Sequence, residues 1–335
     1  MIAKVFLGVA AASLLGCGAG ERSDDGRPSS GVGARSSSGG ASGSGSSSGV
    51  TGGSNNGSAA SGGLVIDVGG GSGTPGNGTL ETCDGVDNDM NGVIDDVDAG
   101  NDGVCDCLNI ATVGHIGPWS NGGNVFASWL DARSPLGAVA LADDELTPDK
   151  LRPFQIVVVL HAAPIEVSNN NVVAPAHHEF SSTEVSAFEA WVRGGGGVIT
   201  TLGYTFDSAR EVVNVNRLLG SLGMGYSTTK FDLYGNVQSW IAHPVSDGIT
   251  NINTAAGVQP DGPDGVTIAL GGNSVALQVA QIDRGRAAVW GDEWITYDSE
   301  WADVEGQQVE RFWLNLLKWL SPPTQCQVPI PAILK

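Results

Sequence analysis

The sequence has few basic residues and no apolar run long enough to span a bilayer. Lys and Arg together number 16 against 36 Asp and Glu, so the formal net charge is −20. A surface this acidic repels phosphate groups, which excludes nucleic acid and anionic lipid headgroups as expected ligands. The one sustained apolar run lies at the start of the chain and is too short for a transmembrane helix.

That first segment has the pattern of an export signal. Lys4 supplies a short positive region and residues 5–15 an apolar one. Leu14-Leu15-Gly16-Cys17 resembles a bacterial lipobox, so we expect residues 1–17 to be a lipoprotein signal peptide that ends at a lipidated Cys17. An ordinary cleaved signal peptide is the alternative. Gly18 rather than Asp after the cysteine implies the outer membrane or cell surface of a Gram-negative bacterium.

Residues 18–79 consist almost entirely of Gly, Ser, Ala, Asn and Thr. Such a segment has too little apolar surface to offset the entropy lost on ordering, so we expect a disordered tether. About 60 flexible residues span roughly 45 Å end to end. A lipid followed by this tether would hold a folded part away from the membrane.

Acidic residues crowd between Cys83 and Cys107, where there is no Lys or Arg. Counted from Asp87 as position 1, oxygen ligands fall at positions 1, 3, 5, 7, 9 and 12 of an EF-hand-type loop. These ligands are Asp87, Asp89, Asn91, the Val93 carbonyl, Asp95 and Asp98. Gly92 at position 6 suits the sharp turn, whereas position 12 has Asp in place of the usual Glu. Without a cation these carboxylates repel one another. We therefore expect residues 80–107 to form a calcium-binding module, the alternative being a solvated acidic linker.

The same stretch resembles a known motif. Cys83-Asp84-Gly85-x-Asp87-Asn88-Asp89-x-Asn91-Gly92-x-x-Asp95 is similar to the metal-binding repeats of secreted bacterial surface proteins and, more distantly, to thrombospondin type 3 and dockerin loops. Those families usually repeat the loop, whereas this chain has one copy. The bacterial version commonly has Cys after Asp-Asn-Asp, where this chain has Met90.

Cysteine is scarce, which limits the possible disulfides. If Cys17 carries lipid, four cysteines remain of the five, namely Cys83, Cys105, Cys107 and Cys326. An even number in an exported protein predicts two disulfides, and four cysteines allow three pairings. We favour Cys83–Cys105, which would close the acidic loop, and Cys107–Cys326, which would tie together the ends of the domain that follows.

Residues 108–323 are long enough for one α/β domain, with residues 324–335 as a C-terminal tail. Apolar runs predict strands at 108–113, 137–141, 155–160 and 197–202. The third run has no alternation, which is typical of a strand buried on both faces of a parallel sheet. Helical spacing predicts helices at 182–192 and 309–320. This order predicts a flavodoxin-like, doubly wound parallel sheet.

Three segments of this domain resemble a family. They are Gly197-Val198-Ile199-Thr200-Thr201-Leu202-Gly203-Tyr204, then His243-Pro244-Val245-Ser246-Asp247-Gly248-Ile249, then Gly285-Arg286-Ala287-Ala288-Val289-Trp290-Gly291-Asp292-Glu293. Together they are similar to class I glutamine-amidotransferase-like domains, in the branch seen in trehalose-utilisation-type and other surface-associated proteins. The amidotransferases of that family need a Cys on the turn after the fourth strand and a His after a later strand. Here Tyr204 stands at the first position and Asp292-Glu293 at the second, so the resemblance implies a domain without amidotransferase activity.

Ligands of open α/β sheets bind beyond the carboxyl ends of the strands. The loops at that edge carry a possible ligand pocket, made of His161, Tyr204, Asp207, Asp292 and Glu293. His177 and His178 are adjacent, so their side chains should diverge, and we expect a solvated pair rather than a metal site. The tryptophans at 290, 294 and 301 are expected in the core, with a sugar-stacking platform as the alternative.

We therefore expect a surface-anchored, non-catalytic calcium-binding lipoprotein. Its degenerate amidotransferase-like domain would serve as a binding or structural module, with cell-surface carbohydrate or protein as the partner. The alternative is a hydrolase acting on cell-surface carbohydrate through the loops at the strand ends. Convergence of His161, Asp207, Asp292 and Glu293 would favour the enzyme, because scattered groups cannot do acid–base chemistry.

Overall fold

The computed structural model describes residues 80–118, 122–169, 172–203, 205–301 and 306–321. The predicted signal peptide with Cys17, the tether, Tyr204, Cys326 and the C-terminal tail lie outside these ranges. In the part that is described, no helix has the length and apolar character needed to cross a membrane.

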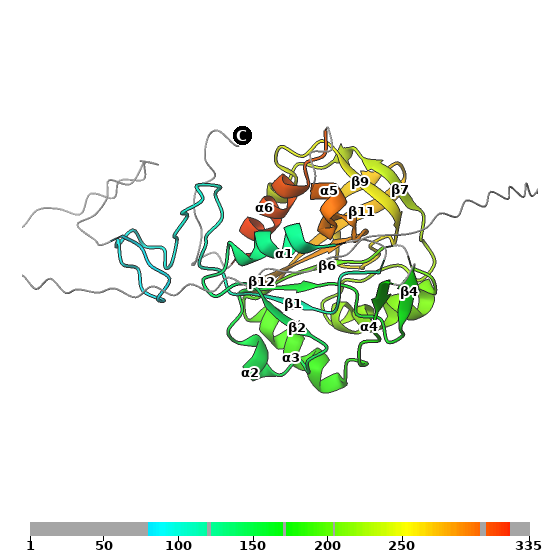
Figure 1. Cartoon of the computed structure of the whole chain (residues 1–335), viewed down its shortest axis with the longest axis horizontal. Coiled ribbons are helices and arrows are strands. Elements are labelled where there is room, and N and C mark those ends of the chain that lie inside the picture. The colour runs from blue at the N-terminus through cyan, green and yellow to red at the C-terminus, as the bar shows by residue number, and fades with distance from the viewer. Residues whose placement is uncertain (1–79, 119–121, 170–171, 204, 302–305, 322–335) are drawn as a thin grey trace, which may run out of the picture. The chain divides into compact units, whose positions relative to one another are not determined.

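An eight-stranded mixed sheet forms the centre of the domain (Figure 1). Across the sheet the strands are β2 (Val139–Ala142), β1 (Ile110–Val113), β3 (Ile156–Val159), β6 (Gly197–Thr201), β12 (Gly285–Trp290), β11 (Ser274–Ile282), β10 (Val266–Gly271) and β8 (Ser239–Trp240). The first five are parallel, and counted along the chain they have the order 2-1-3-4-5. The predicted α/β class is confirmed.

The predicted parallel sheet is confirmed only for these five strands, because β11, β10 and β8 extend it with antiparallel pairings. Two tight turns explain the difference. Gly272, at φ 62°, lies in the turn from β10 to β11, and Asp283, at φ 51°, lies in the turn from β11 to β12. A connection this short joins only antiparallel neighbours, since parallel strands need a crossover of a dozen residues or more.

Helices cover both faces of the sheet (Figure 1). One core contains side chains of α1 (Asn124–Asp131) and α6 (Val309–Leu320), and the other those of α2 (Pro148–Leu151), α3 (Ser182–Arg193) and α4 (Ser208–Gly220). Strand β3 separates the two cores: Ile156 and Val158 belong to the first, Val157 and Val159 to the second. The prediction that this strand is buried on both faces is confirmed.

Local sequence accounts for the helix ends. The Ser181 side chain accepts from the Glu184 backbone N–H at 3.2 Å, and the Glu184 carboxylate accepts from Ser181 N–H at 2.8 Å, which is a complete capping box at the start of α3. Helix α6 has the predicted bounds, and its apolar stripe is buried. Both predicted helices are thus confirmed.

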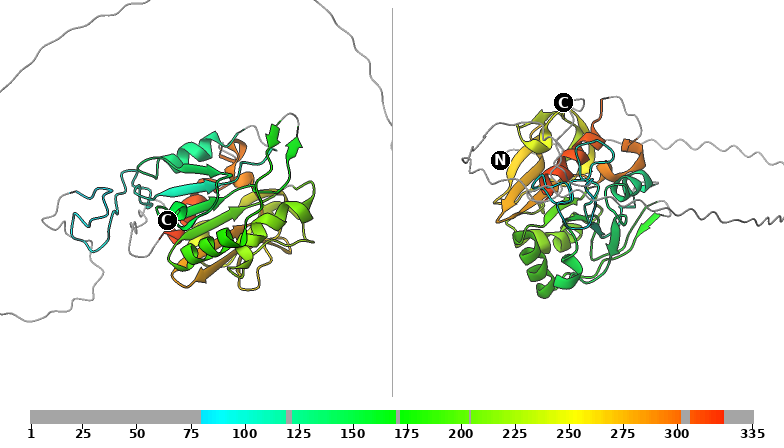
Figure 2. Two further views of the ribbon diagram at one scale, coloured as in Figure 1. Left: turned by 90° about the horizontal axis from the view of Figure 1, so that it is seen from below. Right: turned by 90° about the vertical axis from the view of Figure 1, so that its left-hand side faces the viewer.

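Smaller elements surround the sheet. Strands β4 (Val167–Asn169) and β5 (Val172–Ala174) form one antiparallel pair, and β7 (Leu233–Val237) and β9 (Ile252–Gly257) another. The short elements are η1 (Pro244–Ser246), η2 (Trp294–Thr296) and α5 (Asp298–Trp301). The β4–β5 pair projects from the body of the domain (Figure 2).

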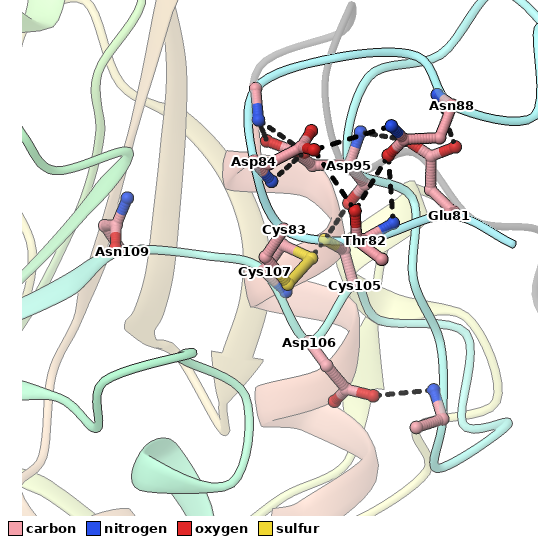
Figure 3. Close-up of a disulfide and its surroundings, with 12 residues drawn as sticks. Glu81, Thr82, Cys83, Asp84, Asn88, Asp95, Cys105, Asp106, Cys107 and Asn109 are labelled. Atoms are coloured by element: carbon pink, nitrogen blue, oxygen red, sulfur yellow. Dashed lines mark hydrogen bonds between the residues drawn. A yellow bond between two sulfur atoms is a disulfide. The ribbon is translucent and has the colours of Figure 1, made fainter. Parts of the chain in front are cut away.

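The acidic segment 80–107 leads into the amino end of β1, and a disulfide closes it (Figure 3). This disulfide joins Cys83 to Cys107, whose Cα atoms are 5.2 Å apart. Both predicted pairings, Cys83–Cys105 and Cys107–Cys326, are therefore wrong. Cys105 and Cys107 are two residues apart and both buried, so sequence proximity could not decide which of them meets Cys83.

The end of this segment packs against the α/β domain. Val104, Cys105 and Cys107 belong to the same apolar core as α1 and α6. Asp102 forms an ion pair with Arg133, whose guanidinium carbon lies 3.7 Å from the centre of the Trp129 ring. The junction between the acidic segment and the domain is therefore held by apolar contacts and by a partly buried charge pair.

Candidate functional site

The carboxyl ends of β1, β3, β6 and β12 bring the predicted pocket residues to one edge of the sheet. His161 follows β3 and pairs with His115, after β1, through two backbone hydrogen bonds of 2.9 and 3.0 Å. Asp292 and Glu293 follow β12, and Gly203, after β6, packs against both of them. Four loops far apart in the sequence thus meet here, as the topology predicts.

His161 has a buried acidic partner that sequence reasoning missed. Its Nε2 lies 3.3 Å from Oε2 of Glu211, in the first turn of α4, and both side chains are only 1% exposed. Oε1 of Glu211 accepts the backbone N–H groups of Phe206 and Asp207 at 2.6 and 2.7 Å. Glu211 therefore fixes both the histidine ring and the loop that follows β6. A carboxylate among the apolar positions of an amphipathic helix was the signal available in the sequence.

Glu293 is the second buried acid of this edge. Its Oε1 accepts a hydrogen bond from the Tyr297 hydroxyl, whereas Oε2 has no hydrogen-bond partner among the described residues. The carboxyl group lies over Gly117, where a Cβ atom would come within 2.2 Å of Oε2. Burial raises the pKa of Glu293 well above its ordinary value, and the nearby charges of Asp292 and Glu211 raise it further. Burial therefore favours the protonated, uncharged form of this side chain.

Asp292 is buried as well, but its oxygens are occupied. Oδ2 accepts from Ala255 N–H at 2.6 Å and Oδ1 from Trp294 N–H at 2.8 Å. Burial raises its pKa to about 7, although those backbone hydrogen bonds act in the opposite direction. Asp292 therefore ties β9 to the turn after β12, and its role is structural rather than that of an exposed ligand group.

Further polar atoms at this edge have no partner. Buried side-chain atoms without a hydrogen bond among the described residues include His161 Nδ1, Thr201 Oγ1, Trp290 Nε1 and Glu293 Oε2. Thr201 and Trp290 are the last residues of neighbouring strands and face each other in register. An unmade buried hydrogen bond costs about 1–3 kcal/mol, so water or a ligand group is expected next to such an atom.

The remaining predicted pocket residues behave differently. The side chain of Asp207 points to the surface, where it pairs with Arg210 at 3.7 Å and is 47% exposed. Tyr204 lies outside the described residues. Of the predicted set, His161, Asp292 and Glu293 are thus brought together and buried, and Asp207 is not.

The adjacent histidines His177 and His178 are not a solvated pair, so that prediction is wrong. They lie in an irregular segment, and their rings are 4.5 Å apart rather than diverging. Nδ1 of His178 lies 2.7 Å from Asp143 and Nε2 lies 2.8 Å from Glu184, and these two carboxylates raise the pKa of His178.

Asp143, His177 and His178 are candidates for a metal site, because their potential ligand atoms lie within 4.8 Å of one another. Both ring nitrogens of His177, however, face backbone carbonyl oxygens, at 2.8 and 3.1 Å. A neutral imidazole carries one N–H, so one of these two contacts is a donated hydrogen bond. Together with the bonds of His178 to Asp143 and Glu184, these contacts join the loop after β2 to the start of α3.

Trp290, the last residue of β12, and Trp301 contribute to the core rather than to a platform. Trp290 is fully buried and stacks on Trp240, with ring centres 6.2 Å apart. Trp301 packs on Phe126 and Trp129. The expectation that these side chains contribute to the core is confirmed for these two.

In the acidic segment, most of the predicted calcium ligands accept backbone N–H bonds. Asp87 accepts from Asn91 and Gly92 at 3.1 and 2.8 Å, and Asp98 from Asp102 and Gly103. Asp95 accepts from Asp84 and Gly85, and Asn91 from Val93 (Figure 3 shows Asp84 and Asp95).

The acidic groups whose oxygens lie within 4.8 Å of one another are Glu81, Asp89 and Asp96. Only Asp89 belongs to the predicted ligand set. Glu81 also organises the loop, because its two oxygens accept from the backbone N–H groups of Asn88, Asp89 and Asp95 (Figure 3 labels Glu81, Asn88 and Asp95). The segment thus holds a set of oxygens suited to a hard cation, in an arrangement that differs from the predicted order.

No protein-family model matches this chain, and no curated protein matches it. Among solved structures, a cytoplasmic protein from Salmonella typhimurium LT2 is 11% identical with a TM-score of 0.48, covering 64% of this chain and 100% of that chain. A putative ThuA-like protein from Bacteroides uniformis ATCC 8492 is 13% identical with a TM-score of 0.39, covering 63% and 89%.

An exo-β-1,4-mannosidase from Opitutaceae bacterium strain TAV5 is 10% identical with a TM-score of 0.39. The match covers 63% of this chain and 36% of the mannosidase. At these values of identity and TM-score, we infer neither ligand nor activity from these similarities.

Proposed function

We propose that the protein is a surface-displayed binding lipoprotein whose α/β domain takes a small ligand at the carboxyl edge of the sheet. The observation that supports this proposal is the set of buried, unpartnered polar atoms there, above all His161 Nδ1 and Glu293 Oε2. The strand order 2-1-3-4-5 supports a flavodoxin-like domain, which binds ligands at this edge. The resemblance of the sequence to amidotransferase-like domains that lack the catalytic Cys and His supports binding rather than amidotransferase chemistry.

The remaining parts of the proposal concern display. Lipid on Cys17 would anchor the chain, residues 18–79 would act as a tether, and calcium would stiffen residues 80–107. Asp102 forms an ion pair with Arg133, and Val104 belongs to the core of the domain. These contacts support a rigid connection between residues 80–107 and the domain.

A thermal-shift screen tests the binding function without presuming the ligand. Soluble components of cell envelopes (monosaccharides, amino acids, nucleosides and short peptides) are added to the full chain. A ligand at 100 times its Kd stabilises the folded form by about 2.7 kcal/mol, which is a readily measured shift in Tm. We expect at least one class to stabilise the wild type but not a variant with His161→Ala and Glu293→Ala. No shift with any class, or equal shifts in the variant, would contradict the proposal.

Anchoring has a separate test. Wild-type protein should take up radioactive palmitate and partition into detergent, whereas Cys17→Ala should be found in the soluble fraction. Wild-type protein that is fully soluble and carries no label would show that an ordinary signal peptide is present.

A second function, hydrolysis of cell-surface carbohydrate, is favoured by one observation. Burial raises the pKa of Glu293 well above its ordinary value, and a raised pKa is what a carboxyl group needs to act as a general acid. Release of reducing ends from envelope polysaccharide, lost in Glu293→Gln, would establish the enzyme. In either case glutamine should not be hydrolysed, because residues 108–323 contain no cysteine.

A further inference from the structure

All four ring nitrogens of His177 and His178 face oxygen atoms. Nε2 of His178 lies 2.8 Å from Oε1 of Glu184, and Nε2 of His177 lies 3.1 Å from the carbonyl oxygen of Ala142. The two Nδ1 atoms lie 2.7 and 3.2 Å from one oxygen, Oδ1 of Asp143, and that of His177 also lies 2.8 Å from the His178 carbonyl. Two neutral imidazoles supply only two N–H groups. The other two nitrogens need a cation, which is either a second proton on each ring or a metal ion.

The Nε2 contacts match those of metal-binding histidines. The Glu184 carboxylate also accepts two backbone N–H groups, at 3.0 and 2.8 Å, so it is an acceptor and Nε2 of His178 donates to it. A proton on Nε2 of His177 donates in the same way to Ala142. Both rings then have an Nδ1 lone pair next to Asp143. A histidine that binds a metal usually donates its other ring N–H to a carboxylate or to a backbone carbonyl, which is the arrangement of both rings here.

The spacing of the three side chains suits one small ion. One ligand atom from each of Asp143, His177 and His178 lies within 4.8 Å of the other two. At zinc–ligand distances of about 2.0–2.2 Å, the ligand atoms of a tetrahedral site are roughly 3.4 Å apart. The contact of 3.2 Å between Asp143 and His177 is close to this spacing, and that of 2.7 Å between Asp143 and His178 needs to lengthen by about 0.7 Å. The half-exposed Asp143 side chain has room to make this adjustment.

Backbone contacts hold the ligands in place without an ion. The backbone N–H of His178 donates to Oδ1 of Asp143 at 2.7 Å, which joins the loop after β2 to the histidine segment. The buried Asn214 amide donates to the His178 carbonyl at 2.8 Å, and the His177 N–H donates to the Ala163 carbonyl at 2.8 Å. The ligand set is therefore preorganised by the fold.

Charge also favours a divalent ion. Among the described residues, the ion pairs of Asp143 and Glu184 are with these two histidines alone. Protons on both rings would balance the two carboxylates, but they would place two positive imidazoliums with ring centres 4.5 Å apart, and the His177 side chain is 0% exposed. Like charges at this distance repel, and burial disfavours a charged ring. One divalent ion between two neutral rings gives the same total charge without that repulsion.

We propose that Asp143, His177 and His178 bind a divalent transition-metal ion, with zinc as the expected metal. The two histidines bind it through Nδ1 and the aspartate through its carboxylate. Three protein ligands leave one position of a tetrahedral zinc, and the side chains of Asp143 and His178 are 49% and 32% exposed, so water can fill it. Imidazole nitrogen selects transition metals, whereas calcium takes oxygen ligands. This site is thus separate from the acidic segment 80–107 and goes beyond the proposed binding function.

Titration calorimetry of the full chain with zinc chloride tests the site, in excess calcium to fill the oxygen-only sites. We expect one zinc ion. Asp143→Asn and His178→Ala should each weaken its binding by about tenfold or more, as expected for loss of a ligand. The Asn oxygen can still accept the His178 backbone N–H, so Asp143→Asn keeps the contact that orders the loop. Asp144→Asn, at the exposed neighbouring carboxylate, is the matched control and should bind like wild type.

Nitrogen NMR gives a readout that a change in folding would not produce. On addition of zinc, the ¹⁵N resonances of Nδ1 should move in both His177 and His178, while Nε2 keeps its proton in each ring. His243, whose Nδ1 accepts the Val245 N–H at 3.2 Å, is the control within the same spectrum and should not respond.

Three results would overturn the inference. They are the absence of zinc-dependent heat in excess calcium, equal zinc affinity in wild type and Asp143→Asn, and Nδ1 resonances that do not move when zinc binds. The ligand screen at the carboxyl edge is run without zinc, so either proposal can fail while the other stands.

Discussion

Nε2 of His161 lies 3.3 Å from Oε2 of Glu211, and neither side chain has appreciable contact with solvent. One residue follows a central strand and the other lies in the first turn of a helix 50 positions later. The pair connects two loops of the carboxyl edge, because Glu211 also binds the backbone of Phe206 and Asp207. It therefore holds the imidazole in one orientation.

Replacing Glu211 should show how much this pair contributes. Glu211→Ala removes the acceptor of two backbone N–H groups and of one buried imidazole nitrogen, so we expect a loss of about 3 kcal/mol in the free energy of unfolding. Asp207→Asn, at an exposed side chain, should change it by less than about 0.5 kcal/mol. Urea titration of the full chain measures both. Equal effects of the two substitutions would contradict the structural role given to Glu211.

Glu211→Gln has a spectroscopic signature. Its amide oxygen can still accept the two backbone N–H groups, which turns the amide NH₂ toward His161. The imidazole should then accept at Nε2 and carry its proton on Nδ1. ¹⁵N NMR of His161 reports which nitrogen is protonated, so an unchanged spectrum would argue against the hydrogen bond.

Stability should depend on pH through Glu293. Its pKa is raised in the folded chain, so above the ordinary value of about 4.3 the folded form holds a proton that the unfolded form has lost. The stabilisation that this proton gives the folded form is therefore complete below about pH 4 and is lost as pH rises toward the folded-state pKa. One proton corresponds to about 1.4 kcal/mol per pH unit.

Glu293→Gln removes that proton linkage. As the pH rises above about 5, its free energy of unfolding should fall less steeply than that of wild type, by up to about 1.4 kcal/mol per unit. Asp292, with its pKa raised to about 7, remains in both proteins and contributes the same slope to each. Glu145→Gln, at an exposed position, serves as the control. Parallel stability curves for wild type and Glu293→Gln would contradict the buried acid.

The disulfide can be mapped directly. Cleavage on the amino side of Asp places Cys83, Cys105 and Cys107 on three different peptides, because Asp84 to Asp102 and Asp106 lie between them. Without reduction, the peptide that ends in Cys83 should be linked to the one that begins at Asp106. If the exported chain has two disulfides, as an even cysteine count predicts, the remaining pair is Cys105 with Cys326. A Cys83–Cys105 link would contradict the structure.

The sequence was most informative where one residue pattern excludes the alternatives. The unbroken run at 156–160 and the helical stripe at 309–320 predicted their elements, because burial on both faces and a 3.6-residue period each have one regular solution. The antiparallel extension was missed although Gly271-Gly272 is a typical hairpin signal.

The site was only partly predictable. His161, Asp292 and Glu293 were found because strand ends in a parallel sheet share an edge. Glu211 was not, since its role depends on how α4 packs. The disulfide was mispredicted because neither spacing nor charge separates Cys105 from Cys107, whereas three-dimensional distance does.

Calcium binding is the last prediction, and two ligand sets can be compared. The EF-hand-type spacing predicts Asp87, Asp89, Asn91, the Val93 carbonyl, Asp95 and Asp98, whereas in the structure the carboxylate of Asp89 lies within 4.8 Å of those of Glu81 and Asp96. Both sets contain Asp89. Asp96 belongs only to the second set, and Asp87 only to the first.

Titration calorimetry on the full chain should give one calcium ion with a Kd of roughly 0.1 to 1 mM, as for extracellular modules. Asp89→Ala should abolish this heat under either arrangement. Loss in Asp87→Ala with retention in Asp96→Asn supports the EF-hand-type order, and the reverse supports the observed cluster. Asp149→Asn, at an exposed side chain of α2, is the control and should bind like wild type. If wild type gives no calcium-dependent heat in the millimolar range, or if Asp89→Ala leaves the heat unchanged, residues 80–107 are an acidic linker and the calcium prediction is wrong.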